Sequence, residues 1–250
     1  MADDEATDSE AVPFEAAVSD SEERQAEFRA AVAAGDAPWG GPPVEGNVST
    51  GFHALDRGWG GFPPGSLVAL VAAPDAPSEE LLYPPATFAP ARYLSMLRNA
   101  PEVERHAAAT GYDTFEVTET DTARLLDDPA GALSGLDPES VVVVDPATEL
   151  EREGRERYLT FVSTLKRAVE TTDSVAILHC PQMNPRALQR DLTLARADAV
   201  LELERYRADD PRHGVQWHLY CHKNRHGPVP ETPVRFDFTD GPRTVQTREI

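Results

Sequence analysis

The chain has 250 residues, and its 43 acidic side chains against 23 basic ones give a formal net charge of -20 at pH 7. That length allows a substantial buried core, whereas no apolar run reaches the roughly 18 residues of a membrane-spanning helix. The only lysines are Lys166 and Lys223, and a surplus of carboxylates with little lysine is typical of proteins that stay solvated in concentrated salt. The charge argues against a broad nucleic-acid surface, although screening in molar salt weakens that argument.

Residues 1–46 differ in composition from the rest of the chain. Residues 1–18 are acidic and poor in large apolar side chains, which predicts a disordered, solubilising tail. A helix is predicted from Ser19 or Asp20 to Gly35, and a linker rich in proline and glycine follows it. The N-terminus lacks the basic and apolar regions of a signal peptide, so we expect a cytoplasmic protein. We divide the chain into this extension and a core domain, residues 47–250.

An apolar strand that begins at Leu67 runs into a turn and then into a short helix, which is the layout of a phosphate-binding loop. In such loops glycines let backbone N–H groups surround phosphate oxygens, a lysine neutralises the phosphates, and a hydroxyl holds Mg²⁺. The positions that require glycine, glycine, lysine and hydroxyl hold Ala73, Ser78, Glu79 and Glu80. None of the four carries the required chemistry, so the sequence predicts a degenerate phosphate loop.

Two features of this stretch oppose nucleotide binding. Glu79 places a carboxylate where a cation would meet polyphosphate, and like charges at contact distance cost on the order of a few kcal/mol at an effective dielectric of about 20. Pro84 and Pro85 remove backbone donors and clash with the preceding turn, so we expect about one or two helical turns behind the loop. The architecture of a nucleotide-binding domain would then persist without its central chemistry.

A passage with spaced glycines, from Asn47 to Ser66, leads into this strand. Its order of Ser-Thr-Gly, Leu-Asp, a glycine cluster and Pro-Pro-Gly-Ser resembles the lead-in of the RecA superfamily, most closely of its KaiC-like branch. The resemblance implies a RecA-like fold over about residues 47–240. The matching residues are Ser49, Thr50, Gly51, Leu55, Asp56, Gly58, Gly60, Gly61, Pro63, Pro64, Gly65 and Ser66.

Two further strands end where KaiC-like proteins carry acidic residues. After the strand predicted at Ala91–Met96, the resemblance implies carboxylates that activate water, but Leu97 and Arg98 stand there and neither can act as the base. Ser140–Asp145 is predicted as a central parallel strand, because four valines precede a carboxylate. Asp145 resembles the acid that positions Mg²⁺ in a Walker B element. The alternative is an acid that faces a helix or caps a loop.

The remaining periodicity predicts alternating helices and strands, and therefore an α/β domain with a mostly parallel sheet flanked by helices. Helices are expected at Pro101–Thr110, 121–128, Glu153–Glu170 and Pro185–Arg196. Strands are expected at Phe115–Thr118, Ser174–Cys180, 197–205 and from Trp217, with closing edge strands at Phe236–Phe238 and 244–250.

Histidines and cysteines near the strand ends allow more than one interpretation. Cys180 and Cys221 lie in apolar runs and are expected to be buried thiols. His179 stands where the resemblance implies a residue that senses the γ-phosphate, and the simpler interpretation is a histidine hydrogen-bonded to backbone. A metal site is an alternative if His179, Cys180, Cys221, His222 and His226 converge. No tight ligand pair supports it, so we expect no metal.

The segment Trp217–Gly227 ends in Lys-Asn-Arg-His-Gly. KaiC-like domains carry a Lys-x-Arg-x-Gly element after such a strand, and Lys223, Arg225 and Gly227 match it. The resemblance implies that the lysine and arginine reach a nucleotide held by the adjacent subunit and stabilise the transferred charge. The alternative is a basic hairpin that pairs with surface carboxylates.

The joint loss of the loop glycines, the lysine, the hydroxyl and the strand-end carboxylate favours a catalytically inactive KaiC-like protein without a cofactor. We expect it to act as a regulatory or scaffold subunit, in signalling or transcriptional control. Its partners would be proteins, either a catalytically competent RecA/KaiC-like paralogue or further copies of itself.

Two other hypotheses stay open. One is an ATPase that binds ATP and Mg²⁺ in an unconventional site, with Arg92 or Arg98 as the missing cation. By analogy with its relatives, such a protein would serve DNA recombination or repair. The other is a half-site, in which Lys223 and Arg225 complete the pocket of a competent partner.

Overall fold

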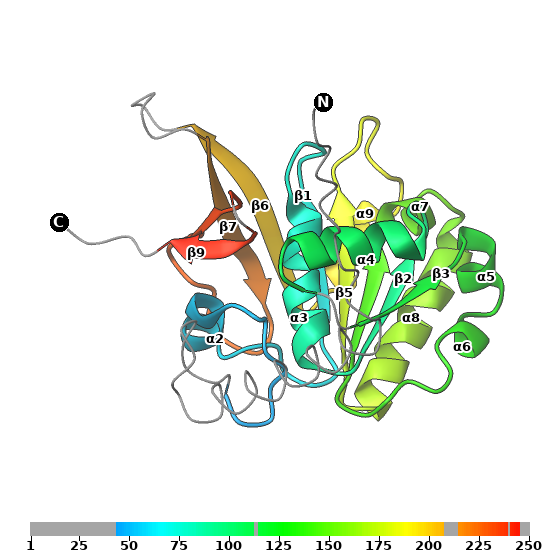
Figure 1. Cartoon of the computed structure of the whole chain (residues 1–250). Coiled ribbons are helices and arrows are strands. Elements are labelled where there is room, and N and C mark those ends of the chain that lie inside the picture. The colour runs from blue at the N-terminus through cyan, green and yellow to red at the C-terminus, as the bar shows by residue number, and fades with distance from the viewer. Residues whose placement is uncertain (1–43, 113–114, 208–214, 240, 246–250) are drawn as a thin grey trace, which may run out of the picture.

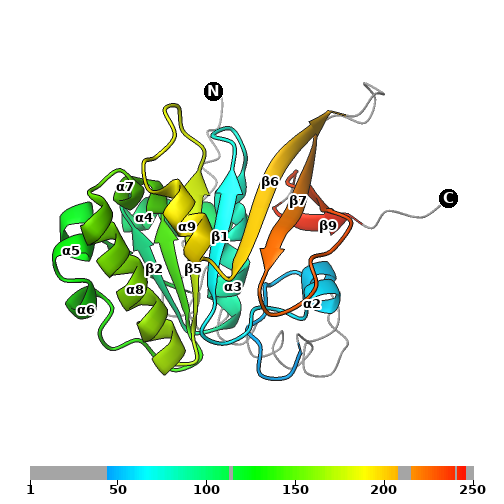
Figure 2. The same cartoon turned by 180° about the vertical axis from the view of Figure 1, so that it is seen from behind.

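The computed structural model describes residues 44–112, 115–207, 215–239 and 241–245, which form one twisted sheet with helices against both faces (Figure 1, Figure 2). The predicted acidic tail, the predicted helix after it and the linker up to residue 43 lie outside the described residues. The division into an extension and a core domain therefore stays a prediction. In the described part of the chain, no helix is long and apolar enough to cross a membrane.

The described strands form a 9-stranded sheet in the order β3-β2-β4-β5-β1-β6-β7-β8-β9. Neighbours from β3 to β6 are parallel, and neighbours from β6 to β9 are antiparallel. The predicted α/β class with a mostly parallel sheet is thereby confirmed. The strands are β1 Leu67–Ala72, β2 Ala91–Ser95, β3 Glu116–Glu119, β4 Val141–Asp145, β5 Val175–Pro181, β6 Ala199–Arg207, β7 Val215–Asn224, β8 Val234–Asp237 and β9 Arg243–Val245.

Two apolar cores lie on opposite faces of the sheet. Along β1, Leu67 and Val71 belong to the core under α8, whereas Val68 and Leu70 belong to the core under α3. A strand buried on both faces has apolar residues throughout, which is why the central strands are so rich in valine and leucine. The helices are α2 His53–Trp59, the 3₁₀ helix η1 Ser78–Leu81, α3 Tyr83–Phe88, α4 Ala100–Ala109, α5 Thr122–Asp127, α6 Pro129–Ala132, α7 Ala147–Glu151, α8 Arg155–Thr171 and α9 Arg190–Arg196.

The lead-in segment is organised by the buried carboxylate of Asp56. Its Oδ1 accepts hydrogen bonds from the backbone N–H and the hydroxyl of Thr50, both at 2.8 Å, and its Oδ2 accepts one from Ser49 at 2.5 Å. Gly51 has a φ of +77°, and a Cβ built there would lie 2.3 Å from Pro84 Cβ in α3. A glycine is therefore required where the lead-in crosses the helix that follows the loop after β1.

A second carboxylate, Asp198, joins three distant parts of the chain at the start of β6. Its Oδ2 accepts the backbone N–H of Leu67 at 3.0 Å and the ammonium of Lys166 at 2.8 Å. The same ammonium donates to the carbonyl oxygen of Gly65 at 2.7 Å. The amino end of β1, the helix α8 and the strand β6 are thus held at one point.

The structure departs from the sequence-based expectation in a few elements. The helix predicted at Pro185–Arg196 begins only at Arg190. The backbone N–H of Gln189 does not take part in that helix, because it donates to the carbonyl of Glu151 at the end of α7, at 3.0 Å. Helices α6 and α7 have 4 and 5 residues, too few for a periodic signal, and were not expected. Behind the loop, α3 has 6 residues with prolines in its first turn, in agreement with the expected one or two turns.

Candidate functional site

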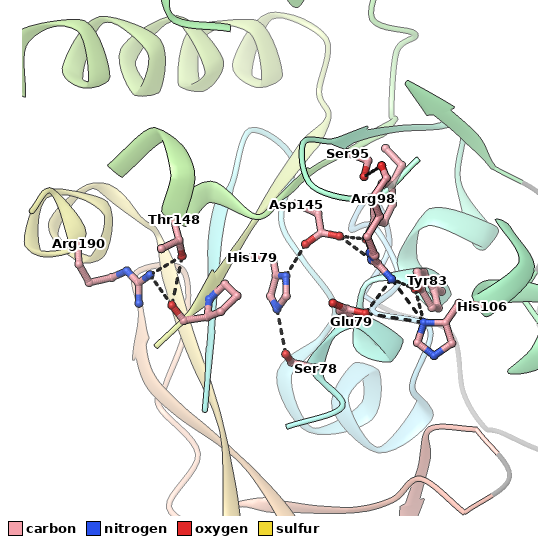
Figure 3. A network of polar contacts seen from close by, with 12 residues as sticks. Ser78, Glu79, Tyr83, Ser95, Arg98, His106, Asp145, Thr148, His179 and Arg190 are labelled. Atoms are coloured by element: carbon pink, nitrogen blue, oxygen red, sulfur yellow. Dashed lines mark hydrogen bonds and ion pairs between the residues drawn. The ribbon is translucent and has the colours of Figure 1, made fainter. Parts of the chain in front are cut away.

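The polar site lies at the carboxyl ends of the parallel strands β1, β2, β4 and β5, where ligands bind in open α/β sheets (Figure 3). Asp145 is the last residue of β4 and is paired in register with Ser95 at the end of β2. On the other side of Asp145, β5 carries His179. The loop after β1 brings η1 and its residues Ser78 and Glu79 to the same edge.

Asp145 is the centre of this network and divides its two oxygens between different partners. Oδ1 lies 2.6 Å from Nδ1 of His179. Oδ2 accepts hydrogen bonds from the hydroxyl of Tyr93 at 2.5 Å and from Nη2 of Arg98 at 2.7 Å. Burial by itself would raise the pKa of Asp145, but the hydrogen bond from His179 and the charge on Arg98 outweigh it and hold that pKa well below its usual range. The carboxylate is therefore ionised although it is buried.

Arg98 joins Asp145 to the loop residue Glu79. Its Nη1 lies 2.7 Å from Oε2 of Glu79, while its Nη2 lies 2.7 Å from Oδ2 of Asp145. Its side chain is only 16% exposed, and its backbone carbonyl accepts the hydroxyl of Ser95 at 2.6 Å. One guanidinium thus pairs with two carboxylates, one from η1 and one from β4.

Aromatic side chains surround the outer end of Arg98. The hydroxyl of Tyr83 accepts a hydrogen bond from Nη1 of Arg98 at 3.2 Å and lies 3.0 Å from Nδ1 of His106. The rings of Tyr83 and Tyr93 stack on Phe115, with centroids 5.8 and 5.5 Å apart. Burial raises the pKa of Tyr83 to about 12, so its hydroxyl keeps its proton at neutral pH.

The inner end of the network runs from Asp145 through His179 to Ser78. Nε2 of His179 lies 2.9 Å from Oγ of Ser78, and both residues are buried. The expectation that His179 is satisfied by backbone groups was therefore wrong, because its two ring nitrogens contact the side chains of Asp145 and Ser78. A continuous chain of polar contacts leads from Ser78 to Glu79 by way of Asp145 and Arg98 (Figure 3).

The four positions singled out in the phosphate-loop pattern have different surroundings. Ala73 directly follows β1 and makes a turn contact, its carbonyl accepting the N–H of Ala76 at 3.0 Å. Ser78 and Glu79 belong to the network described above. Glu80 turns away from it, and its buried Oε2 has no hydrogen-bond partner among the described residues. Burial, and then the charge of Glu79, raise the pKa of Glu80 to about 7.

Lys223 and Arg225 lie elsewhere, at the carboxyl end of α9. The ammonium of Lys223 donates to the carbonyls of Leu194 and Ala195, at 2.9 and 3.1 Å. Arg225 donates to the carbonyl of Ala195 at 2.7 Å. Cations at these unpaired carbonyls stabilise a helix through hydrogen bonds and the helix dipole. Their predicted action on a neighbouring subunit stays a prediction.

Arg92, named as an alternative cation, is not part of the site. Its guanidinium donates to the carbonyls of Ser134 and Gly135, both at 2.9 Å, on the far side of β2. That alternative was wrong, because the loop after α6 holds Arg92 and leaves Arg98 as the cation at the carboxyl edge.

The alternative metal cluster does not form in the described part of the chain. His179 and Cys180 lie on β5 and Cys221 and His222 on β7, and the strands β1 and β6 separate the two. No group of three or more potential ligands converges among the described residues. Cys180 is buried as expected, whereas Cys221 is only partly buried because it lies near the uncovered end of the sheet.

A second buried network, which sequence reasoning missed, lies beside the first. Nε of Arg190 in α9 lies 2.9 and 2.8 Å from the two carboxylate oxygens of Glu151 in α7. Nη2 of Arg190 donates to the hydroxyl of Thr148 at 2.9 Å (Figure 3). The hydroxyl of Thr193 donates to Glu151. Such a fully paired ion pair fixes α7 and α9 against β5. No local sequence pattern predicts this ion pair, because Glu151 and Arg190 are about 40 residues apart.

The strand order, the loop after β1 and the acid at the end of β4 define a RecA-like fold. A KaiC-like protein from the hyperthermophilic archaeon Pyrococcus horikoshii OT3 has a crystal structure that matches 82% of this chain and 100% of its own, with a TM-score of 0.65 and 15% identity. At that identity the likeness shows the fold. The predicted RecA-like fold is confirmed.

A family model identifies the chain more closely. Residues 47–250 match the family of unknown function DUF7125, and the chain belongs to that family. A comparison with curated proteins found no match.

Proposed function

We propose that this protein is a KaiC-like RecA-fold protein of haloarchaeal type that does not use ATP and acts by binding, as a regulatory or scaffold subunit in the cytoplasm. Signalling or transcriptional control is the setting we favour. The partners would be a catalytically competent RecA/KaiC-like paralogue or further copies of the chain. The degenerate phosphate loop predicted from Ala73, Ser78, Glu79 and Glu80 is the basis of this proposal.

The observation that carries it is the position of Arg98 between Glu79 and Asp145. A Mg-nucleotide needs a cation near its terminal phosphates and a carboxylate that is free to hold the hydrated metal. At this edge the residue in the lysine position is an acid, and Oδ2 of Asp145 is 2.7 Å from Arg98. The residues present do not fit a Mg-nucleotide, because the cation and both carboxylates are already paired with one another and their net charge is negative.

Nucleotide titration in molar KCl tests the proposal. We expect no heat of binding and no increase in melting temperature with Mg-ATP at millimolar concentration. A ligand at about 100 times its dissociation constant would stabilise the fold by about 2.7 kcal/mol, so micromolar binding would be plain in either measurement and would refute the proposal. The same titration with the Arg98→Ala variant is a matched control, since it removes the blocking cation and leaves the acids in place.

A second candidate function follows from the same guanidinium. Arg98 lies 2.7 Å from the residue in the lysine position, so it is the cation nearest to the place of a terminal phosphate among the described residues. An ATPase that uses Arg98 in this way, in DNA recombination or repair, would hydrolyse ATP steadily and lose that activity in the Asp145→Asn variant. Absence of turnover in the wild-type protein rejects this candidate.

The half-site hypothesis needs its own test, because Lys223 and Arg225 would have to leave the end of α9 to reach a partner. Turnover of a competent KaiC-like paralogue is measured with and without this protein. If the protein accelerates turnover and Arg225→Ala abolishes the effect, the contact across subunits is established. An effect that survives Arg225→Ala rejects it.

A further inference from the structure

We propose that Ser78, His179 and Asp145 act as nucleophile, general base and orienting acid, and that they give this protein an acyl-transfer activity toward small uncharged carboxylic esters. This inference does not depend on the proposed function, because a protein that ignores ATP can still carry a reactive serine. It rests on the geometry at the inner end of the polar network.

The three residues are arranged in the order that nucleophilic catalysis by serine requires. Oγ of Ser78 lies 2.9 Å from Nε2 of His179, and Nδ1 of the same ring lies 2.6 Å from Oδ1 of Asp145. A serine becomes a nucleophile when a base accepts its proton and a third group orients that base. Such sets are recognised by geometry rather than by chain order, and here the acid, the base and the serine arise from β4, β5 and the loop after β1.

The tautomer of the imidazole follows from its surroundings. Asp145 is ionised and accepts a hydrogen bond at Oδ1, so the proton of a neutral ring resides on Nδ1 and the lone pair of Nε2 faces Ser78. The other carboxylate oxygen is held by Tyr93 and Arg98, which leaves Oδ1 to His179. The low pKa of Asp145 ensures that the carboxylate stays ionised when the ring takes a second proton.

The side chain of Ser78 is buried, but its neighbours in the sequence reach the solvent. It is only 3% exposed, but the residues on both sides of it, Pro77 and Glu79, are partly exposed, and Pro74 and Asp75 are exposed. The chain on both sides of Ser78 is thus open to solvent, and movement of the short loop between β1 and η1 would give a reagent access to Oγ.

The charges near Ser78 set the class of substrate. Glu79 and Glu80 follow it directly and Asp75 precedes it, so anions such as phosphate esters are repelled. Arg98, the nearest cation in the described network, is already paired with Glu79 and Asp145. An uncharged ester of a short carboxylic acid is not repelled by these acids and needs no free cation to bind.

The reaction is an ordinary two-step ester hydrolysis. Oγ of Ser78 forms a bond to the carbonyl carbon while its proton passes to Nε2 of His179, and that proton then leaves with the departing alcohol as the C–O bond breaks. Water next attacks the acyl-serine, gives a proton to His179, and releases the carboxylic acid as Ser78 regains its proton. No metal, redox partner or nucleotide takes part.

The test uses the full-length protein in molar KCl and a biotin-linked fluorophosphonate, which forms a P–O bond to an activated serine with loss of fluoride. We expect one adduct per chain, located on Ser78 by peptide mass spectrometry, and none in Ser78→Ala. The matched control is Ser66→Ala, since Ser66 is also buried but lies at the opposite, amino-terminal end of β1, where its hydroxyl has no hydrogen-bond partner among the described residues. That variant should be labelled like the wild type.

Hydrolysis of p-nitrophenyl acetate gives a second readout. A positioned general base contributes about 10²-fold to 10⁴-fold, so His179→Gln should lower both the labelling rate and the esterase rate at least about a hundredfold. A denaturation curve shows whether each variant is folded, and Ser78→Ala decides the outcome if His179→Gln is not. No adduct on Ser78 in the folded wild-type protein, or equal esterase rates in Ser78→Ala and Ser66→Ala, would overturn the proposal.

Discussion

Two regions of this protein resemble motifs of the KaiC-like branch, and they differ in what they have kept. The loop after β1 does not carry the residues of the phosphate-loop pattern, yet it lies in a dense buried network with Asp145, Arg98 and His179. The segment at the end of β7 carries the lysine and arginine of its pattern, yet both cap the end of α9 within the same chain. A motif whose residue types match can therefore make different contacts from those the motif implies. A motif whose residue types do not match can still form a densely packed polar network.

The two regions also differ in how strongly the fold depends on them. In the first region Arg98 and Asp145 are largely buried and paired, so removal of one partner leaves an uncompensated charge. Charges in the second region are largely solvated and act through helix carbonyls and, for Arg225, through the carboxylate of Asp198 at 3.7 Å. Substitutions in the buried network should therefore lower the free energy of unfolding by several kcal/mol more than substitutions at the end of α9.

Arg98→Ala should have the largest effect. It leaves the buried Asp145 and the half-exposed Glu79 without their shared cation, so we expect the free energy of unfolding to fall by about 3 to 5 kcal/mol. Urea denaturation in molar KCl measures it. Arg92→Ala, which removes exposed hydrogen bonds to loop carbonyls, is the matched control and should cost about 1 kcal/mol. Equal losses in the two variants would contradict the central role of Arg98.

Asp145→Asn should cost about 2 to 4 kcal/mol at pH 7, and the cost should depend on pH. The pKa of Asp145 is depressed in the folded protein, so the ionised carboxylate stabilises the fold above its unfolded pKa of about 3.9. That stabilisation fades as pH falls toward the folded pKa. The difference in unfolding free energy between the wild type and Asp145→Asn should be about 1 kcal/mol smaller at pH 3 than at pH 7. A gap that is constant with pH would mean that the carboxylate is not held ionised.

Glu80→Gln should stabilise the protein, in contrast to its neighbour. The pKa of Glu80 is raised to about 7, so the folded state is penalised as pH rises from the unfolded value of about 4.3 and the penalty is complete above the folded one. Because the side chain is partly exposed, screening reduces the gain to about 1 kcal/mol at pH 8, and it should be smaller at pH 5. Thermal melts at the two pH values measure this. Glu79→Gln, which loses the pair with Arg98, should destabilise at both.

Lys223→Met should have the smallest effect, a loss of about 0.5 to 1 kcal/mol from the end of α9. Arg167→Met, at an exposed position on α8, is the matched control and should change stability by less than about 0.5 kcal/mol. Both are measured by thermal denaturation of the isolated protein. If Lys223→Met changes nothing in isolation but weakens a complex with a KaiC-like paralogue, the cross-subunit role is favoured over the cap.

Much of the fold was predictable because its signals are local. The valine-rich β4, the apolar β1 and the periodic α8 each carry a pattern within one element, and the glycines of the lead-in mark its turns. The short helices α6 and α7 were missed, since 4 or 5 residues give no period. Elements whose start is set by a distant hydrogen bond, as at the beginning of α9, were placed too early.

The candidate site was predictable only in part. Asp145 and the loop positions were found from the strand-end acid and the spacing after β1, and Arg98 was noticed as a residue in the place of a carboxylate. The side-chain contacts of these residues could not be predicted from the sequence, because Ser78 and His179 are 101 residues apart and Arg98 and Asp145 are 47 apart. Side-chain pairing at that separation depends on the strand order, which no single segment specifies.

The bridge from Glu79 through Arg98 to Asp145 makes the effects of single substitutions at this edge depend on one another. A lysine at position 79 would place an ammonium group beside the guanidinium that lies 2.7 Å from Glu79. Loss of Arg98 alone would leave two acids facing each other. Each single substitution toward the phosphate-loop pattern therefore lowers stability before it supplies a contact to phosphate, and a lysine is tolerated at position 79 only when position 98 changes with it.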